Sequence, residues 1–239
     1  MADSILIVIP IYEGVTHLDF TGPHQFLSRL PGAKVAVASI GGAPVTADGL
    51  CFSLLADLGT IERCDVLCVP GGFGCTDAME NAEFMAAIRR LAGTARYVTS
   101  VCTGSLILGA AGLLRGRRAA CHWAWRDMLP AFGAIPDSAR VVRDGNLITG
   151  GGVTAGIDFA LTLIAELAGP GTAQAIQLAL EYAPDPPFAA GRPETAPEAI
   201  RESVIARMAP TLALRRATVA RVAAALASKN SEVTGSTIT

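Results

Sequence analysis

The sequence predicts an α/β fold in which a mostly parallel central sheet is covered by helices on both faces. Several short runs are continuously apolar and rich in β-branched residues, as expected for strands buried on both faces. These runs alternate with segments whose apolar residues recur every three to four positions, which is typical of amphipathic helices. Hydrophobic residues make up 51% of the 239-residue chain and charged residues 17%, so the chain can bury one large core.

In the first half of the chain, four runs have this strand character: ILIVIPIY, AKVAVASI, CDVLCVP and RYVTSV, in chain order. Helices are expected over LDFTGPHQFLSRL, after the first run, and over residues 80–92, before the fourth. Alternating residues around ADG, between Pro44 and Leu55, predict a small hairpin. The third run ends in a glycine cluster, and the fourth ends at Cys102.

The second half begins with a helix predicted over residues 103–114, followed by GRRAACHW, a short strand that ends near His122. The pair DG between the extended runs of RVVRDGNLITGGG predicts a second hairpin. Two further helices are expected over TAGIDFALTLIAELAG, which is closed by glycine, and over TAQAIQLALEYA.

The composition changes after residue 183, where the proline-rich segment PDPPFAAGRPETAP begins. A helix is expected near residues 197–208, and the Arg- and Ala-rich segment LALRRATVARVAAALASK predicts another. We therefore expect an α/β domain over residues 1–190 and a helical arm over residues 191–228 that packs on the core or on a partner subunit. The last residues, 229–239, are expected to be disordered.

Charge and hydropathy exclude several classes of protein. A formal net charge of −2 offers no electrostatic footprint for nucleic acid or an anionic membrane. No stretch of about 18 residues runs without a charge, a proline or repeated glycines, and the N-terminus lacks the basic residues of a signal peptide. We expect a soluble cytoplasmic protein. The six cysteines are scattered through apolar runs, which predicts mostly buried thiols and no metal site.

Cys102 stands where a predicted strand meets a predicted helix, which Thr103 and Gly104 open. Such a sharp turn is the geometry of a nucleophile elbow, in which the side chain projects into a crevice at the carboxyl edge of the sheet. The N-terminus of the helix should favour thiolate over thiol. The alternative is a cysteine that is simply buried at the end of a strand.

Other features converge on the same edge of the sheet. Gly71 and Gly72 offer backbone N–H groups to a developing negative charge, His122 offers a base, and ITGGGVTAG (148–156) provides a wall of small residues. Asp19 places a carboxyl group at the start of a helix. Each has a structural alternative: the glycines as turns, His122 as a satisfied surface histidine and Asp19 as an N-cap.

Five segments, in this order and spacing, resemble the ThiJ/PfpI superfamily and, within it, the isocyanide hydratases. They are LDFTGP (18–23), VPGGFG (69–74), SVCTGSLILGAAGLL (100–114), CHW (121–123) and GGGVTAGID (150–158). The resemblance covers residues 4–190. It implies a flavodoxin-like three-layer sandwich, a homodimer and a reactive cysteine, with no metal or organic cofactor.

Position by position, the resemblance implies that Cys102 is the nucleophile and Asp19 the essential acid, and that Thr103 belongs to the catalytic set. Contacts to substrate or to developing charge are expected from Gly72, Gly151, Val153 and His122. Thr103 after the cysteine, without an HPE-type segment downstream, counts against peptidase and amidotransferase activity. The hydratases are not thought to need a base at His122. The small, apolar residues at these strand ends favour a modest, uncharged substrate.

The expected reaction is the hydration of an isocyanide to an N-substituted formamide. Cys102 attacks the terminal carbon to form a thioimidate, with Asp19 as general acid and base, and water then releases the product. Another cysteine-dependent enzyme of the superfamily is an alternative.

The sensor domain of AraC-type transcription regulators belongs to the same superfamily and is the alternative from a different class. About 55 residues follow the predicted core, too few for two helix-turn-helix motifs. We expect Arg215, Arg216 and Arg221 to form the solvated face of a C-terminal helix.

Overall fold

The computed structural model describes residues 4–235, with side-chain detail to residue 228. Its main sheet has seven strands in the order β10-β11-β7-β6-β1-β2-β5. The strands are β1 (Ile5–Pro10), β2 (Ala33–Ser39), β5 (Ala56–Asp57), β6 (Val66–Val69), β7 (Tyr97–Val101), β10 (Val141–Asp144) and β11 (Leu147–Gly150). All neighbours are parallel except β10 and β11, which form the hairpin predicted around DG.

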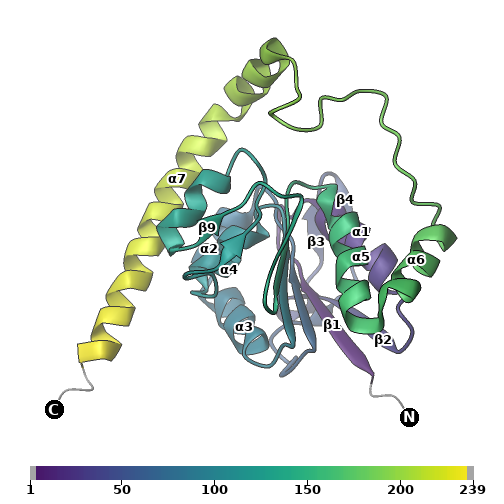
Figure 1. The fold of residues 1–239 in the computed structure, drawn as a ribbon. Coiled ribbons are helices and arrows are strands. Elements are labelled where there is room, and N and C mark those ends of the chain that lie inside the picture. The colour runs from purple at the N-terminus through teal and green to yellow at the C-terminus, as the bar shows by residue number, and fades with distance from the viewer. Residues whose placement is uncertain (1–3, 236–239) are drawn as a thin grey trace.

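Helices cover both faces of this sheet, which confirms the predicted three-layer α/β fold (Figure 1). On one face lie α1 (His17–Leu27), α5 (Ala155–Ala168) and α6 (Pro170–Ala179), and on the other lie α2 (Cys75–Glu80), α3 (Ala82–Ala92) and α4 (Gly104–Ala110). Helix α4 is shorter than the helix expected over residues 103–114. Gly112, with a φ of 83°, lies in the turns that follow it.

The smaller elements lie outside the main sheet. The predicted hairpin is formed by β3 (Val45–Ala47) and β4 (Leu50–Phe52), preceded by the 3₁₀ turn η1 (Ile40–Gly42). The strand expected before His122 is reduced to β8 (Arg118–Ala119), which pairs with β9 (Ile135–Pro136). A second 3₁₀ segment, η2 (Arg126–Phe132), lies between these two strands in the chain.

The C-terminal region forms one continuous helix, α7 (Glu198–Gly235), where the sequence predicted two. Pro210 interrupts the apolar pattern and lies inside this helix, because the Ala-, Leu- and Arg-rich sequence around it favours helix strongly enough to continue past one missing N–H group. The helix contacts α2, α4 and η2 and runs along the outside of that layer (Figure 1). It extends beyond residue 228, and the last part of the expected tail, residues 236–239, lies outside the described residues.

Two expectations about composition can be compared with residues 4–235. No helix there combines the length and apolarity that crossing a lipid bilayer requires. All six cysteines are free thiols, and all but Cys51 are buried, as predicted.

Candidate functional site

Cys102 lies at the elbow between β7 and α4, at the carboxyl edge of the sheet. Its φ of 58° is left-handed, a conformation that is uncommon for a residue with a side chain. The Cys102 N–H donates hydrogen bonds to the carbonyl oxygens of Gly150 (3.1 Å) and Gly151 (2.8 Å), at the end of the neighbouring strand β11. These bonds hold the elbow in the geometry that the sequence predicted.

A cavity of about 240 Å³ opens over this elbow. Its wall combines the elbow, the two glycine-rich loops, the start of α1, the β3–β4 turn, the loop before η2, and α7. The lining residues are Thr16, Asp48, Gly72, Phe73, Cys102, Thr103, His122, Trp125, Val153, Met208 and Arg215. Cys102 is only 4% exposed, yet it forms part of the cavity wall and is not sealed within the core.

Asp19 is fully buried in the first turn of α1, beside the elbow. Its Oδ2 accepts a hydrogen bond from the Gly71 N–H (2.9 Å), and the carboxyl group also interacts with the Cys102 thiol. Its Oδ1 is buried and accepts no hydrogen bond from the described residues. Thr16 holds the N-cap position, so the N-cap alternative for Asp19 is wrong.

The environment of Asp19 favours its neutral form. Burial raises the pKa of the carboxyl from 3.8 to about 7, against the lowering effects of the Gly71 N–H and the Cys102 thiol. An exposed carboxyl on the β3–β4 turn, Asp48, raises the pKa further. The group therefore titrates near neutral pH, where a general acid and base is most effective.

The thiol of Cys102 does not follow the expectation that the helix N-terminus would favour thiolate. Burial raises its pKa well above the usual value, and Asp19 and Cys121 raise it further. The backbone N–H of Thr103 acts in the opposite direction but is outweighed. Helix α4 has only seven residues, so the stabilisation of a thiolate by its dipole is small compared with the effect of burial on the thiol. Burial therefore favours the neutral thiol at this site.

Thr103 and the glycines of the β6–α2 loop connect the elbow to that loop. The Gly72 N–H donates a hydrogen bond to Thr103 Oγ1 (3.0 Å), and this hydroxyl donates to the Gly72 carbonyl (3.3 Å). A Cβ atom on Gly71 would lie 2.4 Å from the Thr103 nitrogen and 2.9 Å from Asp19 Oδ2. Glycine is needed here because the loop approaches both residues so closely. The Gly72 N–H is engaged by Thr103.

His122 is half-buried and borders the cavity. Burial lowers its pKa to about 4, and the nearby Arg215 cation adds to this effect, so the imidazole is neutral at neutral pH. Its Nδ1 accepts a hydrogen bond from the Ala124 N–H (3.2 Å), which places the proton of the neutral ring on Nε2. His122 is thus a hydrogen-bond donor and a weak base.

The structure brings together most of the residues that the sequence predicted. Cys102, Thr103, Gly72, His122 and Val153 line one cavity, with Asp19 directly behind its wall. Gly151 lies just outside: its carbonyl holds the elbow, and the residue lines a neighbouring hollow with Cys121. His122 and Val153 border both spaces.

Arg215 is the site residue that the sequence interpretation assigned wrongly. It is 2% exposed, its guanidinium carbon lies 4.0 Å from the centre of the Trp125 ring, and its Nη2 donates to the carbonyls of Gly72 (3.1 Å) and Phe73 (3.4 Å). The expectation of a solvated face holds only for Arg216 and Arg221, which are exposed.

The sequence itself contains a pattern that indicates a core-facing position for Arg215. Apolar residues with alternating spacings of four and three flank Arg215 on one face of α7: Met208, Leu212, Val219, Val222 and Leu226. These residues are buried or partly buried, so Arg215 occupies a core-facing position. The strand-end residues alone had suggested an apolar cavity. Because Arg215 and Asp48 also line it, the cavity is partly polar.

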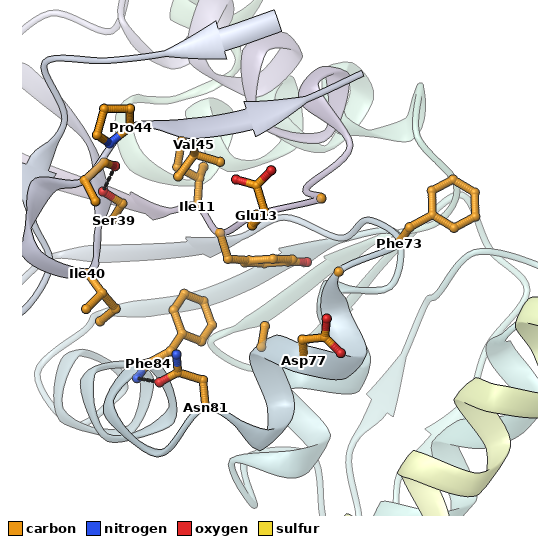
Figure 2. Close-up of a pocket in the computed structure, with 15 residues that line it drawn as sticks. Ile11, Glu13, Ser39, Ile40, Pro44, Val45, Phe73, Asp77, Asn81 and Phe84 are labelled. Carbon is orange, nitrogen blue, oxygen red and sulfur yellow. Dashed lines mark hydrogen bonds between the residues drawn. The ribbon is translucent and has the colours of Figure 1, made fainter. Parts of the chain in front are cut away.

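A larger hollow of about 550 Å³ lies on the other side of the β6–α2 loop (Figure 2). Two of its polar side chains have structural roles. The Asn81 side chain caps α3 by accepting from the Phe84 N–H (2.9 Å), and Glu13 accepts from the Thr46 N–H (2.9 Å). Phe73 is at the edge of this hollow and also lines the Cys102 cavity. Cys102 and Asp19 do not line it, so the smaller cavity is the candidate site.

The fold and the site together define a class: α/β proteins that carry a cysteine at a strand-to-helix elbow, beside a buried carboxyl group. The DJ-1/PfpI family profile matches residues 4–166, which is more than half of the chain. The chain belongs to the DJ-1/PfpI family, as the resemblance to the ThiJ/PfpI superfamily had indicated.

Three relatives show how far this similarity extends. The chain is 54% identical over 209 residues to the isonitrile hydratase of Pseudomonas putida, covering 86% of this chain and 90% of that protein. A ThiJ/PfpI family protein from Pseudomonas syringae, known from its crystal structure, matches with a TM-score of 0.87 and 45% identity, over 93% of this chain and 91% of that one. The HTH-type transcriptional regulator CdhR of Pseudomonas aeruginosa is 34% identical over 139 residues, covering 56% of this chain and 40% of the regulator.

Proposed function

We propose that this protein hydrates isocyanides to N-substituted formamides, with Cys102 as the nucleophile and Asp19 as general acid and base. The observation that carries the proposal is the buried Asp19 carboxyl, which titrates near pH 7 and interacts with a thiol in the cavity wall. The substrate class follows from the similarity to the isonitrile hydratase of Pseudomonas putida, since isonitrile and isocyanide name the same group.

In the first half of the proposed reaction, ionised Asp19 takes the proton of the Cys102 thiol. The thiolate attacks the terminal carbon of R–N≡C, and an S–C bond forms while the C–N triple bond becomes a double bond. Asp19 returns the proton to that carbon, which gives the thioimidate R–N=CH–S. The raised pKa of the carboxyl suits this transfer, because the group can hold the proton and release it at neutral pH.

In the second half, water adds to the same carbon while Asp19 accepts one of its protons. Asp19 passes that proton to the nitrogen, and as the C–S bond breaks the remaining hydroxyl proton goes through Asp19 to the leaving sulfur, which restores the Cys102 thiol and ionised Asp19. The product is R–NH–CHO, so one isocyanide and one water give one formamide. We infer that Thr103 and Gly72 position the loop and the elbow through their paired hydrogen bonds, that the Gly151 carbonyl holds the elbow, and that Val153 shapes the wall against the substrate. Neutral His122 faces the cavity as a hydrogen-bond donor.

We also propose that the chain forms a homodimer in the cytoplasm, without nucleic-acid or membrane partners. Strongly exposed apolar side chains, such as Leu54 and Phe73, support a second subunit, and six free cysteines fit a reducing compartment. Light scattering on the purified protein tests the dimer.

Mass spectrometry of the intact protein, incubated with a simple alkyl isocyanide, tests the chemistry. We expect an adduct on the wild-type protein and none on a Cys102→Ala variant, which also produces no formamide. An Asp19→Asn variant should lose turnover by at least about 100-fold, and any adduct that forms on it should persist. A Cys102→Ala protein that hydrates isocyanides at the normal rate would end this account.

A further inference from the structure

Arg215 is a buried cation that forms no ion pair with a carboxylate in the part of the chain that the structure describes. Its side chain forms hydrogen bonds only to two backbone carbonyls, and it makes no ion pair with any described side chain. Buried charges in proteins are normally paired, because removing an unpaired ion from water is costly. Its exposed neighbours show the usual pattern, since Arg216 pairs with Asp127 and Arg221 with Glu80.

The guanidinium group also keeps donors to spare. Nη2 donates to the carbonyls of Gly72 and Phe73, while Nε is closed to solvent and has no acceptor among the described residues, so the donors open to a ligand are those on the Nη atoms. Nη1 has no hydrogen bond to any of the described residues either. The stacking on Trp125 and the two carbonyl contacts fix the plane of the group, so its free N–H groups have a defined direction.

Arg215 lines the same 240 Å³ cavity as Cys102. The other titratable groups around that space do not neutralise it. Burial and Arg215 lower the pKa of His122 to about 4, so its ring is neutral, and the exposed carboxyl of Asp48 on the β3–β4 turn lines the cavity but forms no ion pair with Arg215 among the described contacts. The site therefore holds a nucleophile on one wall and an unpaired, preoriented cation on another.

We propose that Arg215 is a substrate-binding residue that accepts a carboxylate group, so that the preferred substrates are isocyanides bearing a carboxylate on the carbon chain. This inference rests on the proposed function and narrows it. A carboxylate matches the planar fork of a guanidinium, and its negative charge would balance the buried cation. The isocyanide carbon would then lie at Cys102 while the other end of the molecule is held by Arg215.

Matched substrate pairs test the proposal. The probes are short ω-isocyanoalkanoates of increasing chain length, each compared with the corresponding neutral ω-isocyanoalkanamide, and formamide production gives kcat/KM. For the best chain length we expect the wild-type protein to prefer the carboxylate by about 10- to 100-fold. Arg215→Gln, which keeps a donor for the loop carbonyls but removes the charge, should reduce that ratio to about one. Arg215→Lys should keep part of it.

Arg216→Gln is the control on the same helix and should leave the ratio as in the wild-type protein, since this side chain is exposed and does not line the cavity. The proposal is overturned if the wild-type protein shows no preference for a carboxylate at any chain length. It is also overturned if Arg215→Gln lowers kcat/KM for both members of each pair equally, because Arg215 would then only anchor α7.

A binding measurement separates this proposal from the reaction itself. Calorimetry with ω-formamidoalkanoates and their matched amides should show at least tenfold tighter binding of the carboxylates by the wild-type protein, and no such difference for Arg215→Gln. If no isocyanide is hydrated but this difference is found, the proposed reaction fails and the carboxylate site stands. If isocyanides are hydrated and the difference is absent, the carboxylate site fails alone.

Discussion

Replacing Asp19 with Asn should stabilise the folded protein at neutral and alkaline pH. The folded-state pKa of the carboxyl is raised from 3.8 to about 7, so the folded protein binds a proton that the unfolded chain has already released between these two values. The contribution of Asp19 to wild-type stability therefore falls as the pH rises from about 4 to about 7 and changes no further above it. The shift corresponds to a penalty of about 4 kcal/mol above pH 7, which a neutral Asn does not incur.

Urea unfolding measured by tryptophan fluorescence between pH 4 and pH 8.5 tests this reasoning. The variant should gain little or nothing relative to the wild-type protein near pH 4, and its advantage should grow up to about pH 7. A second variant, Asp185→Asn, is the matched control, because that side chain is exposed and lies outside the Cys102 cavity. A difference between Asp19→Asn and the wild-type protein that is the same at every pH would refute the assignment of a raised pKa to Asp19.

Other predictions follow from the site and its surroundings. Gly71→Ala should cost several kcal/mol and abolish activity, because its Cβ would lie 2.4 Å from a backbone nitrogen of the elbow, whereas Gly171→Ala, in open space in α6, should raise the melting temperature slightly. The kcat/KM for isocyanide hydration should fall as the pH drops below about 7, because protonated Asp19 cannot accept the thiol proton; a flat profile from pH 5 to pH 8 would contradict this. Iodoacetamide at pH 7 should alkylate exposed Cys51 faster than Cys102, as peptide mapping would show, because burial raises the pKa of Cys102.

The sequence was most informative where local pattern determines structure. The parallel strands are continuous apolar runs, and the hairpins have turn residues between extended segments. The positions of the main parallel strands and of both hairpins were therefore predicted correctly. The position of Cys102 at a strand end also follows from sequence alone, because the carboxyl ends of parallel strands share one edge. In the sheet, Ser100 of β7 is level with Val69, and Val101 is level with Gly150, which aligns the three loops.

The predicted exposure of Arg215 was wrong, because it rested on the local composition and not on the helical spacing of the apolar residues around it. Three arginines close together in an Ala-rich segment resemble a solvated helix face, yet only Arg215 shares its face with Met208 and Val219. The repeat runs past Pro210 within one continuous helix, whereas the sequence predicted two separate helices in this segment.

The sequence by itself determined the order of strands and helices, the glycine-rich loops and the placing of Cys102, because these depend on periodicity and turn chemistry within short segments. Only the tertiary structure decided that Asp19 titrates near neutrality, that the Cys102 thiol is not ionised by its helix and that Arg215 enters the cavity. These properties depend on desolvation and on charges from elements far apart in the chain. Arg215 and Gly72, for example, meet across 143 positions of sequence.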